Sequence, residues 1–429
     1  MKKILFLTIF SIISLTLFAQ TEFENKLSSL KGISEIQKLN TNVYPEKYEM
    51  YIEQNVNGTN SDKGKFKQRI IVGFRGYDRP TVIVTEGYSA NYALSERFRE
   101  ELSELCNANI IVCEYRYFEK SCPEPLDWQY LTVNNSLDDL HNIRKTFGEI
   151  FKGKWLSTGV SKGGSTCTYY RARYPEDVDV SVAYVAPISH APEDGRHEPF
   201  LNKKVGTPAE RKAVKDCMTE FMKRKPNLLP MLDTFVVNHK YNFYLPNKNI
   251  FDYMVLEYEF SLWQWGTPIS TIPSKKENDV VWFNYLIQMV EPSYFSYPSN
   301  YLPFFYQVVR EFGYYGYDIK NIKKYTDLKS TKDYVNQIML PQELRDVKFD
   351  PTLYKFTEDY LRNNDPKHIF IYGENDPWTA SGVADWLNCD NKTNMKVYVQ
   401  PNGSHLARIN NMPSKTKEEI KNKISDWLK

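Results

Sequence analysis

The sequence predicts an α/β fold in which a mostly parallel sheet is interrupted by a large, mainly helical insertion. Continuous β-branched runs such as 81–85 (TVIVT) and 109–114 (NIIVCE) are typical of strands buried on both faces of a parallel sheet. These runs alternate with helical patterns up to about residue 189, and the alternation resumes at 365. Because 41% of the 429 residues are hydrophobic and 25% are charged, the chain is globular, which excludes a disordered chain or a multi-span membrane protein.

The first part of the predicted core covers residues 20–189. Apolar residues recur at helical spacing over 92–107 and 136–147, and again over 162–174. The predicted strands of this part are 48–55, 68–74, 81–85, 109–114, 155–158 and 180–186. Strands that alternate with helices in this way favour one sheet covered by helices over separate layers.

The insertion, a predicted cap, covers residues 190–364. It has helical patterns over 208–224 and 332–344, which are separated by loops rich in Pro and Tyr. The second part of the core, residues 365–429, begins with the strand-like runs 368–372 (HIFIY) and 395–399 (MKVYV) and closes with an amphipathic helix over 415–429. The simplest interpretation is one α/β domain that carries a helical cap.

Residues 1–19 have the pattern of a secretory signal peptide. Lys2 and Lys3 precede an uncharged apolar run over 4–18, which is shorter than the roughly 18 to 20 residues that cross a bilayer. We expect cleavage after Ala19 and export to the periplasm or the extracellular space. We expect no stable membrane span in the mature form.

Charge and cysteine content limit the partners of the chain. The full chain has 55 Lys and Arg residues and 53 Asp and Glu residues, so the protein as a whole does not attract nucleic acid. Six cysteines in an exported protein permit up to three disulfides, and the sequence leaves their pairing open. No C-x-x-C pair occurs, and we expect neither a metal nor a cofactor.

The strongest functional motif is G-x-S-x-G over 159–163, which places Ser161 between a predicted strand and a predicted helix. Such a turn needs small residues because strand and helix approach closely, and Gly159, Gly163 and Gly164 satisfy this need. Ser161 is therefore the candidate nucleophile. A structural Gly-rich turn is the alternative interpretation.

A nucleophilic serine needs a base and an acid that orients it, in the chain order Ser, Asp, His for this fold. Asp376 follows the strand HIFIY directly, and His405 follows MKVYV. Loops at the carboxyl ends of parallel strands meet at one edge of the sheet, so the three side chains can converge. Asp385 and Asp390 remain open as alternative acids. The oxyanion hole would use the N–H of Lys162 and that of Tyr88 or Gly87, in the loop after the strand 81–85.

The chain resembles a family of secreted serine aminopeptidases typified by mycelial tripeptidyl aminopeptidase. It resembles, more distantly, lysosomal prolyl carboxypeptidase and its dipeptidyl-peptidase relatives. The segments that carry the likeness are 85–88 (TEGY), 114–118 (EYRYF), 130–132, 159–164, 258–265 (YEFSLWQW), Gln307, 311–315 (EFGYY) and 373–378. The resemblance implies an α/β-hydrolase fold with a helical cap, a triad of Ser161, Asp376 and His405, and release of short peptides from a substrate's N-terminus.

Acidic and aromatic residues are the candidates for substrate recognition. A free N-terminal amine requires an acid in the cleft, and Glu86 and Glu259 are the candidates, although each can equally be a structural hydrogen-bond partner. Aromatic residues make up 15% of the chain and concentrate between Tyr241 and Tyr317, where core packing of the cap explains many of them. Those we expect to line an apolar pocket for Pro or bulky apolar residues are Trp263, Trp265, Phe305 and Tyr306.

The sequence thus favours an exported serine exopeptidase, an aminopeptidase that releases di- or tripeptides from short peptides through an acyl-enzyme. A serine carboxypeptidase or an esterase on the same fold is the alternative. A catalytically silent binding protein is a third hypothesis, which the intact Ser161, Asp376 and His405 oppose.

Overall fold

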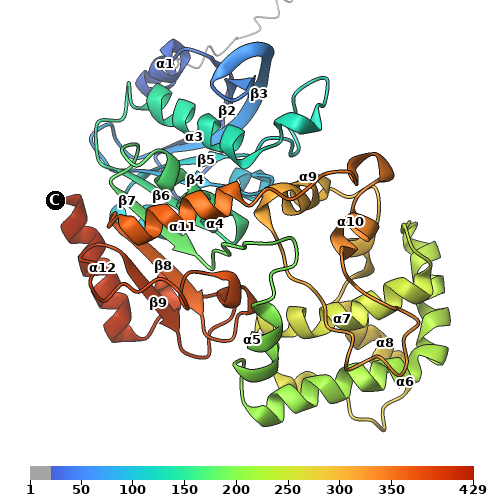
Figure 1. Cartoon of the computed structure of the whole chain (residues 1–429). Coiled ribbons are helices and arrows are strands. Elements are labelled where there is room, and N and C mark those ends of the chain that lie inside the picture. The colour runs from blue at the N-terminus through green and yellow to red at the C-terminus, as the bar shows by residue number, and fades with distance from the viewer. Residues whose placement is uncertain (1–20) are drawn as a thin grey trace, which may run out of the picture.

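A nine-stranded sheet forms the centre of the computed structural model, which describes residues 21–429 (Figure 1). The predicted signal peptide, residues 1–19, lies outside these residues. The strands are β1 (Ile33–Lys38), β2 (Glu46–Asn57), β3 (Asn60–Phe74), β4 (Thr81–Thr85), β5 (Asn109–Cys113), β6 (Trp155–Val160), β7 (Val180–Tyr184), β8 (His368–Gly373) and β9 (Lys396–Gln400).

The sheet is antiparallel at one side and parallel over the rest. Its order is β1-β2-β3-β5-β4-β6-β7-β8-β9, and the pairs are antiparallel from β1 to β5 and parallel from β5 to β9. All five residues of β4, and all five of β5, are buried, as their β-branched composition predicted. With the cap inserted between β7 and β8, this arrangement confirms the predicted α/β-hydrolase fold.

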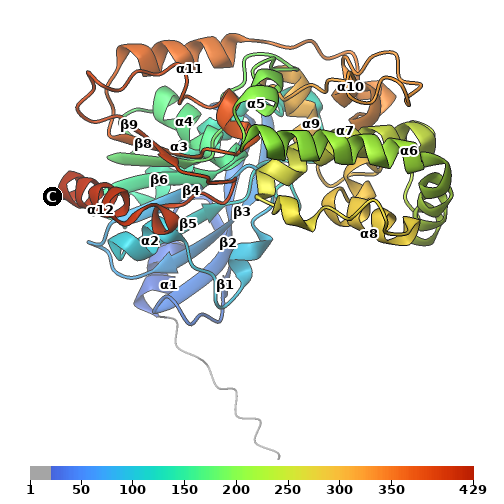
Figure 2. The ribbon, with the colours of Figure 1, turned by 90° about the horizontal axis from the view of Figure 1, so that it is seen from below.

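Helices cover both faces of the sheet (Figure 2). The helices on one face are α3 (Val133–Phe147), α4 (Lys162–Arg173) and α11 (Thr352–Asn363), with α1 (Glu22–Ser29) near the antiparallel edge, and those on the other face are α2 (Glu101–Cys106) and α12 (Ser414–Leu428). Alternation along β4 divides the core: Ile83 packs with the first set of helices, and Val82 and Val84 pack with the second.

Two elements near the N-terminus differ from the prediction. The helix predicted over 92–107 is split into a short turn, η1 (Asn91–Leu94), and α2. The split occurs because Glu100 caps α2, its carboxylate accepting the backbone N–H groups of Leu102 at 2.9 Å and Ser103 at 2.6 Å. Strand β1 and helix α1 were not predicted at all.

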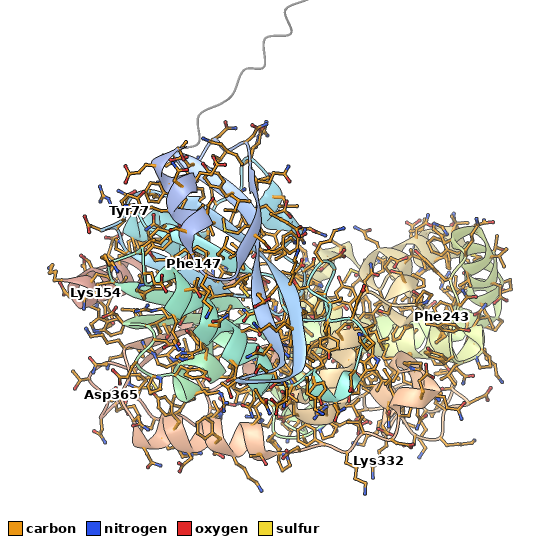
Figure 3. All side chains as sticks on the ribbon, turned by 90° about the horizontal axis from the view of Figure 1, so that it is seen from above. Tyr77, Phe147, Lys154, Phe243, Lys332 and Asp365 are labelled. Atoms are coloured by element: carbon orange, nitrogen blue, oxygen red, sulfur yellow. The ribbon has the colours of Figure 1, made fainter. Side chains whose placement is uncertain are left out.

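The cap consists mainly of helices and lies beside the sheet half of the molecule (Figures 1 and 3). In Figure 3, Phe147 lies in the sheet half and Phe243 in the cap half. The cap helices are α5 (His197–Lys203), α6 (Pro208–His239), α7 (Asn247–Trp265), α8 (Asp279–Met289), α9 (Leu302–Gln307) and α10 (Tyr334–Met339). Within residues 21–429, no helix combines the length and the apolarity needed to cross a bilayer.

The end of one cap helix and the C-terminal boundary of the cap differ from the prediction. Helix α6 continues past the predicted end at 224 through Pro226 and Pro230, because buried Leu228 and Leu232 hold this stretch against the rest of the cap and offset the lost hydrogen bonds. Helix α11 falls within the predicted insertion 190–364 but packs on α4, with Leu361 fully buried, so it belongs to the core layer. All six cysteines are unpaired.

Candidate active site

Ser161 sits in a strained turn between β6 and α4. Its φ of 56° and ψ of −124° are unusual for a residue with a side chain, and its backbone N–H donates to the carbonyl of Tyr184 at 2.9 Å. A Cβ on Gly159 would lie 2.2 Å from the carbonyl oxygen of Gly163, and one on Gly164 would lie 2.7 Å from that of Tyr184. The glycines of the motif are therefore required by close packing, and the turn presents Ser161 at the sheet edge.

His405 and Asp376 form a buried hydrogen-bonded pair. The Nδ1 atom of His405 lies 2.7 Å from Oδ2 of Asp376, whose other oxygen accepts the backbone N–H of Trp378 at 3.1 Å. Because an ionised carboxylate only accepts hydrogen bonds, the imidazole proton lies on Nδ1 and the lone pair on Nε2. Nε2 is buried and has no hydrogen-bond partner among residues 21–429, so it is free to act as a base.

The loops that carry these residues leave the same edge of the sheet. Asp376 caps the short turn η7 (Pro377–Ser381) after β8, and His405 lies in the loop after β9. The two loops are tied together, since the N–H of Asn375 donates to the carbonyl of Gly403 at 2.8 Å. The alternative acids Asp385 and Asp390 are exposed, and Asp385 pairs with Lys204 at 2.7 Å instead of approaching His405.

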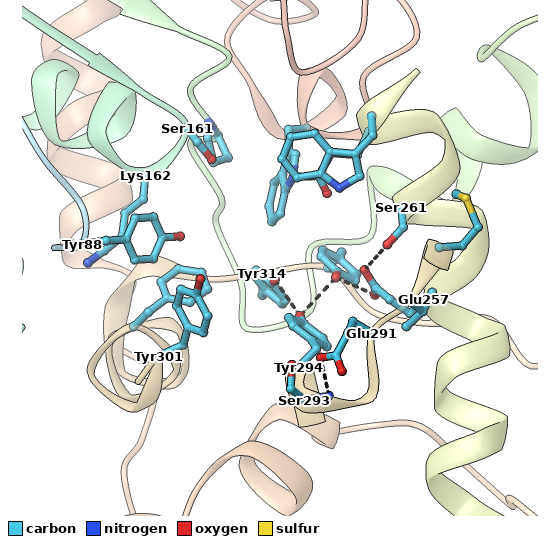
Figure 4. Close-up of a pocket in the computed structure, with 18 of the residues that line it drawn as sticks. Tyr88, Ser161, Lys162, Glu257, Ser261, Glu291, Ser293, Tyr294, Tyr301 and Tyr314 are labelled. Carbon is cyan, nitrogen blue, oxygen red and sulfur yellow. Dashed lines mark hydrogen bonds between the residues drawn. The ribbon is translucent and has the colours of Figure 1, made fainter. Parts of the chain in front are cut away.

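A cavity of about 310 Å³ connects Ser161 with the cap (Figure 4). Figure 4 shows Ser161, Lys162 and Tyr88 on one side and Glu257 and Ser261 on the other. Aromatic rings form much of its wall, among them Tyr88, Trp265, Tyr294, Tyr301, Phe304 and Tyr314. The cavity is therefore rich in aromatic rings, most of which differ from those that the sequence suggested.

Both predicted oxyanion donors adjoin this cavity. Lys162 is the first residue of α4, and neither its backbone N–H nor that of Tyr88 has an acceptor among the described residues. Gly87, the alternative donor, lies under the side chain of Lys162, whose Nζ donates to the Gly87 carbonyl at 2.7 Å. The helix N-terminus also places a positive dipole end beside Ser161.

Glu257, in α7, lines the cavity and was not predicted from the sequence. It accepts hydrogen bonds from Ser261 Oγ at 3.0 Å and from the hydroxyls of Tyr315 at 2.7 Å and Tyr317 at 2.6 Å. Only 6% of the residue is exposed, and burial raises its pKa to about 7. No basic side chain in the described part of the chain pairs with it, so its negative charge is uncompensated.

The two acids predicted to bind the substrate amine do not line the Ser161 cavity. Glu86 bonds to the hydroxyl of Tyr92 and lines a separate pocket against α2, where burial raises its pKa to about 7. Glu259 forms an ion pair with Lys215 on the far side of α7. It lies two residues from Glu257, and at about 100° per residue the two carboxylates point to nearly opposite faces of the helix. The acids that line the Ser161 cavity are instead Glu257 and Glu291.

The four predicted aromatic contacts divide in the same way. Trp265 lines the cavity, and its ring stands edge-on to His405 at a centroid distance of 6.0 Å. Trp263, Phe305 and Tyr306 are buried in cap packing instead. Trp263 covers Gly206, and Phe305 and Tyr306 pack against Tyr294 and Trp128. None of these three lines the Ser161 cavity, and all three contribute to the packing of the cap.

The fold, and the position of Ser161 in the turn between β6 and α4, define an α/β-hydrolase. Comparison with known proteins identifies its family. Residues 19–429 match the PS-10 peptidase S37 family, and the chain belongs to this family. The protein is therefore a serine peptidase, and the predicted resemblance to serine aminopeptidases is confirmed.

One curated relative is a prolyl tri/tetrapeptidyl aminopeptidase from Streptomyces mobaraensis, which is 25% identical over 390 residues that cover 88% of this chain and 79% of that protein. Two solved structures were also similar. A proline iminopeptidase from Mycobacterium smegmatis has a TM-score of 0.39 at 12% identity and covers 92% of this chain and 99% of its own. A peroxisomal α/β-hydrolase from Saccharomyces cerevisiae has a TM-score of 0.40 at 11% identity and covers 89% of each chain.

Proposed function

We propose that the protein is an exported aminopeptidase that releases di- or tripeptides from the N-terminus of short peptides. Ser161 is the nucleophile, His405 the general base and acid, and Asp376 the group that orients and stabilises the imidazolium. The 2.7 Å contact between His405 and Asp376 and the free Nε2 atom support these roles. No cofactor enters the reaction.

The reaction proceeds in two halves. Nε2 of His405 takes the proton of Ser161 Oγ as this oxygen attacks the scissile carbonyl carbon, and the carbonyl oxygen becomes an oxyanion that accepts the N–H groups of Lys162 and Tyr88. The imidazolium then protonates the leaving amine, the C–N bond breaks and an acyl-enzyme remains. Water, deprotonated by His405, hydrolyses the ester and restores Ser161.

The observation that carries the aminopeptidase assignment is the uncompensated carboxylate of Glu257 in the same cavity as Ser161. The N-terminal ammonium of a peptide supplies the missing positive charge. Lys162 is the one basic residue among the described residues of the lining, and its amine is bonded to a backbone carbonyl. A substrate carboxylate would thus face Glu257 and Glu291 without a free cation, which weighs against a carboxypeptidase.

The aromatic wall and the similarity to an enzyme named for tri/tetrapeptidyl release support a short product with Pro or a bulky apolar residue before the scissile bond. Digestion of a library of free-amine peptides, with product masses measured, tests this. Products longer than three residues, or cleavage that ignores the N-terminus, would contradict it.

The decisive comparison uses a peptide amide with a free N-terminus and its N-acetylated form. We expect turnover of the first and little of the second, and equal turnover of both would overturn the assignment. Glu257→Gln should raise KM for the free-amine peptide by roughly 10- to 100-fold, the effect of losing a charged hydrogen bond. Glu259→Gln, two residues along the same helix but outside the cavity, is the matched control and should leave KM unchanged.

Export rests on residues 1–19. The positive charges of Lys2 and Lys3, the apolar run and the start of the family match at residue 19 support a cleaved signal peptide. N-terminal sequencing of protein purified from cell fractions should give Gln20 in the exported fraction. An intact Met1 in the cytoplasmic fraction alone would refute export.

A further inference from the structure

The side chain of Lys162 is buried beside the nucleophile, where a lysine is uncommon. Only 1% of the residue is exposed, its Nζ lies 3.7 Å from the ring centroid of Tyr115, and burial lowers its pKa well below the usual range. The amine does not pair with a carboxylate; it donates to the carbonyl oxygen of Gly87 at 2.7 Å. Because this amine is buried, it cannot serve as a surface charge that keeps the protein soluble, so its presence beside Ser161 has another cause.

The geometry of the loop after β4 gives that explanation. The carbonyl of Gly87 and the N–H of Tyr88 belong to one planar trans peptide unit, so they point in opposite directions. A hydrogen bond that fixes the Gly87 carbonyl therefore fixes the direction of the Tyr88 N–H. The Tyr88 carbonyl is held as well, since it accepts the N–H of Tyr115 at 3.0 Å.

A second contact joins the same two segments. A Cβ on Gly87 would lie 2.7 Å from both Cβ and Cγ of Lys162, so the lysine methylenes lie directly on the glycine. Because no side chain fits between them, Gly87 is needed for the amine to reach its own carbonyl. The loop is thus clamped to the first residue of α4 by packing and by one hydrogen bond.

We infer that Lys162 is a positioning residue whose side chain holds the Gly87–Tyr88 peptide so that the Tyr88 N–H completes the oxyanion hole. The other donor of this hole is the backbone N–H of Lys162 itself. One residue therefore sets both donors, one directly and one through its amine. The inference rests on the proposed role of Ser161 as nucleophile, and it adds a requirement for the side chain that follows the nucleophile.

Lys162→Met tests the inference, because methionine keeps the length and the apolar stem and removes the donor. We expect kcat to fall by about 10- to 100-fold, less than the full loss of an oxyanion donor, while KM changes little. The tetrahedral inhibitor Ala-Ala-boroPro, whose boronate hydroxyl occupies the oxyanion position, should lose affinity by the same factor. The affinity for the product Ala-Ala-Pro should stay constant.

The chain supplies a closely matched control. Lys47 is also 1% exposed, and its Nζ also donates to a single backbone carbonyl, that of Ser95, at 2.8 Å, but it lies outside the cavity. Lys47→Met should lower the melting temperature without changing kcat or boronate affinity. A merely structural role of Lys162 would produce this same pattern in Lys162→Met.

Gly87→Ala provides a second route that does not depend on the folding of Lys162→Met. The added methyl group pushes the lysine stem away from the loop, and the same parallel loss of kcat and boronate affinity should follow. Values within about twofold of wild type in both variants, or a loss confined to KM, would overturn the inference. Mass spectrometry of wild-type protein treated with a fluorophosphonate distinguishes failure of the inference about Lys162 from failure of the proposed function. A missing adduct on Ser161 would refute the proposed function itself.

Discussion

The backbone carbonyl of Gln264, in the last turn of α7, accepts the backbone N–H of His405 at 2.9 Å. The cap therefore contacts the loop of the proposed catalytic base directly. The next residues strengthen the contact: Trp265 stands edge-on to the imidazole, and a Cβ on Gly266 would lie 3.0 Å from Cβ of Ser404. The position of His405 depends on the cap as well as on the sheet.

Gly266→Ala should disturb this contact. Gly266 has a φ of 65°, so alanine costs about 1 to 2 kcal/mol in backbone strain and also pushes on Ser404. Gly64→Ala is the control, because Gly64 has a φ of 83° but nothing within 4 Å of the added methyl group. Both variants should have a lower melting temperature than wild type, and only Gly266→Ala should have a lower kcat, by several-fold. Equal kcat in the two variants would show that the cap contact does not position His405.

Asp376→Asn should reduce turnover by about 10³- to 10⁴-fold and leave the fold intact, because an amide no longer selects the tautomer with a free Nε2. Steady-state rates and circular dichroism of the purified variant check this. Asp385→Asn and Asp390→Asn change exposed carboxylates of the same region and should keep wild-type rates. Near-native activity of the Asp376 variant would mean that another acid orients His405.

Trp265 and Trp263 should behave differently although they are two residues apart on one helix. Trp265 is 52% exposed and lines the cavity, so Trp265→Ala should raise KM with little effect on the melting temperature. Trp263 is 6% exposed and packs over Gly206, so Trp263→Ala should cost about 3 to 5 kcal/mol of unfolding free energy. Enzyme kinetics and denaturant titration of both variants test the pair, and a reversed pattern would contradict the placement of α7.

The stability of the protein should depend on pH through Glu257. Its pKa in the folded state is about 7, against an ordinary value of 4.5, so between these values the folded state holds this proton and the unfolded state releases it. The stabilising contribution is present below pH 4.5 and is lost as the pH rises through 7. The amide side chain of the Glu257→Gln variant cannot titrate. The melting temperature of this variant, relative to that of wild type, should therefore rise as the pH increases from 5 to 8. A constant difference would mean that Glu257 titrates normally.

The places of the three proposed triad residues in the fold could be predicted from the sequence because each follows a strand closely. Ser161 follows β6, and Asp376 and His405 follow β8 and β9 within a few residues, so local pattern and turn chemistry were sufficient. The need for Gly159 and Gly164 could also be predicted, because a close approach of two backbones requires glycine.

The acidic residue of α7 that lines the cavity could not be predicted, because α7 is buried on all sides. Every residue from Ile250 to Trp263 is buried, so no periodic pattern distinguishes the face that meets the cavity from the face that meets α6. Choosing Glu257 over Glu259 requires the rotation of the helix, which depends on packing far away in sequence. The strained backbone of Ser161 and the contact between Gln264 and His405 are likewise invisible to local pattern.

The donors around Glu257 have a practical consequence for enzymology. Ser261, Tyr315 and Tyr317 are neutral, so they orient the carboxylate without balancing its charge. Under the proposed function, any small ammonium ion that fits the cavity should compete with the peptide terminus for the same oxygen atoms. Amine buffers such as Tris should act as competitive inhibitors, whereas phosphate at the same pH and ionic strength should not, and apparent affinities will depend on the buffer in which they are measured.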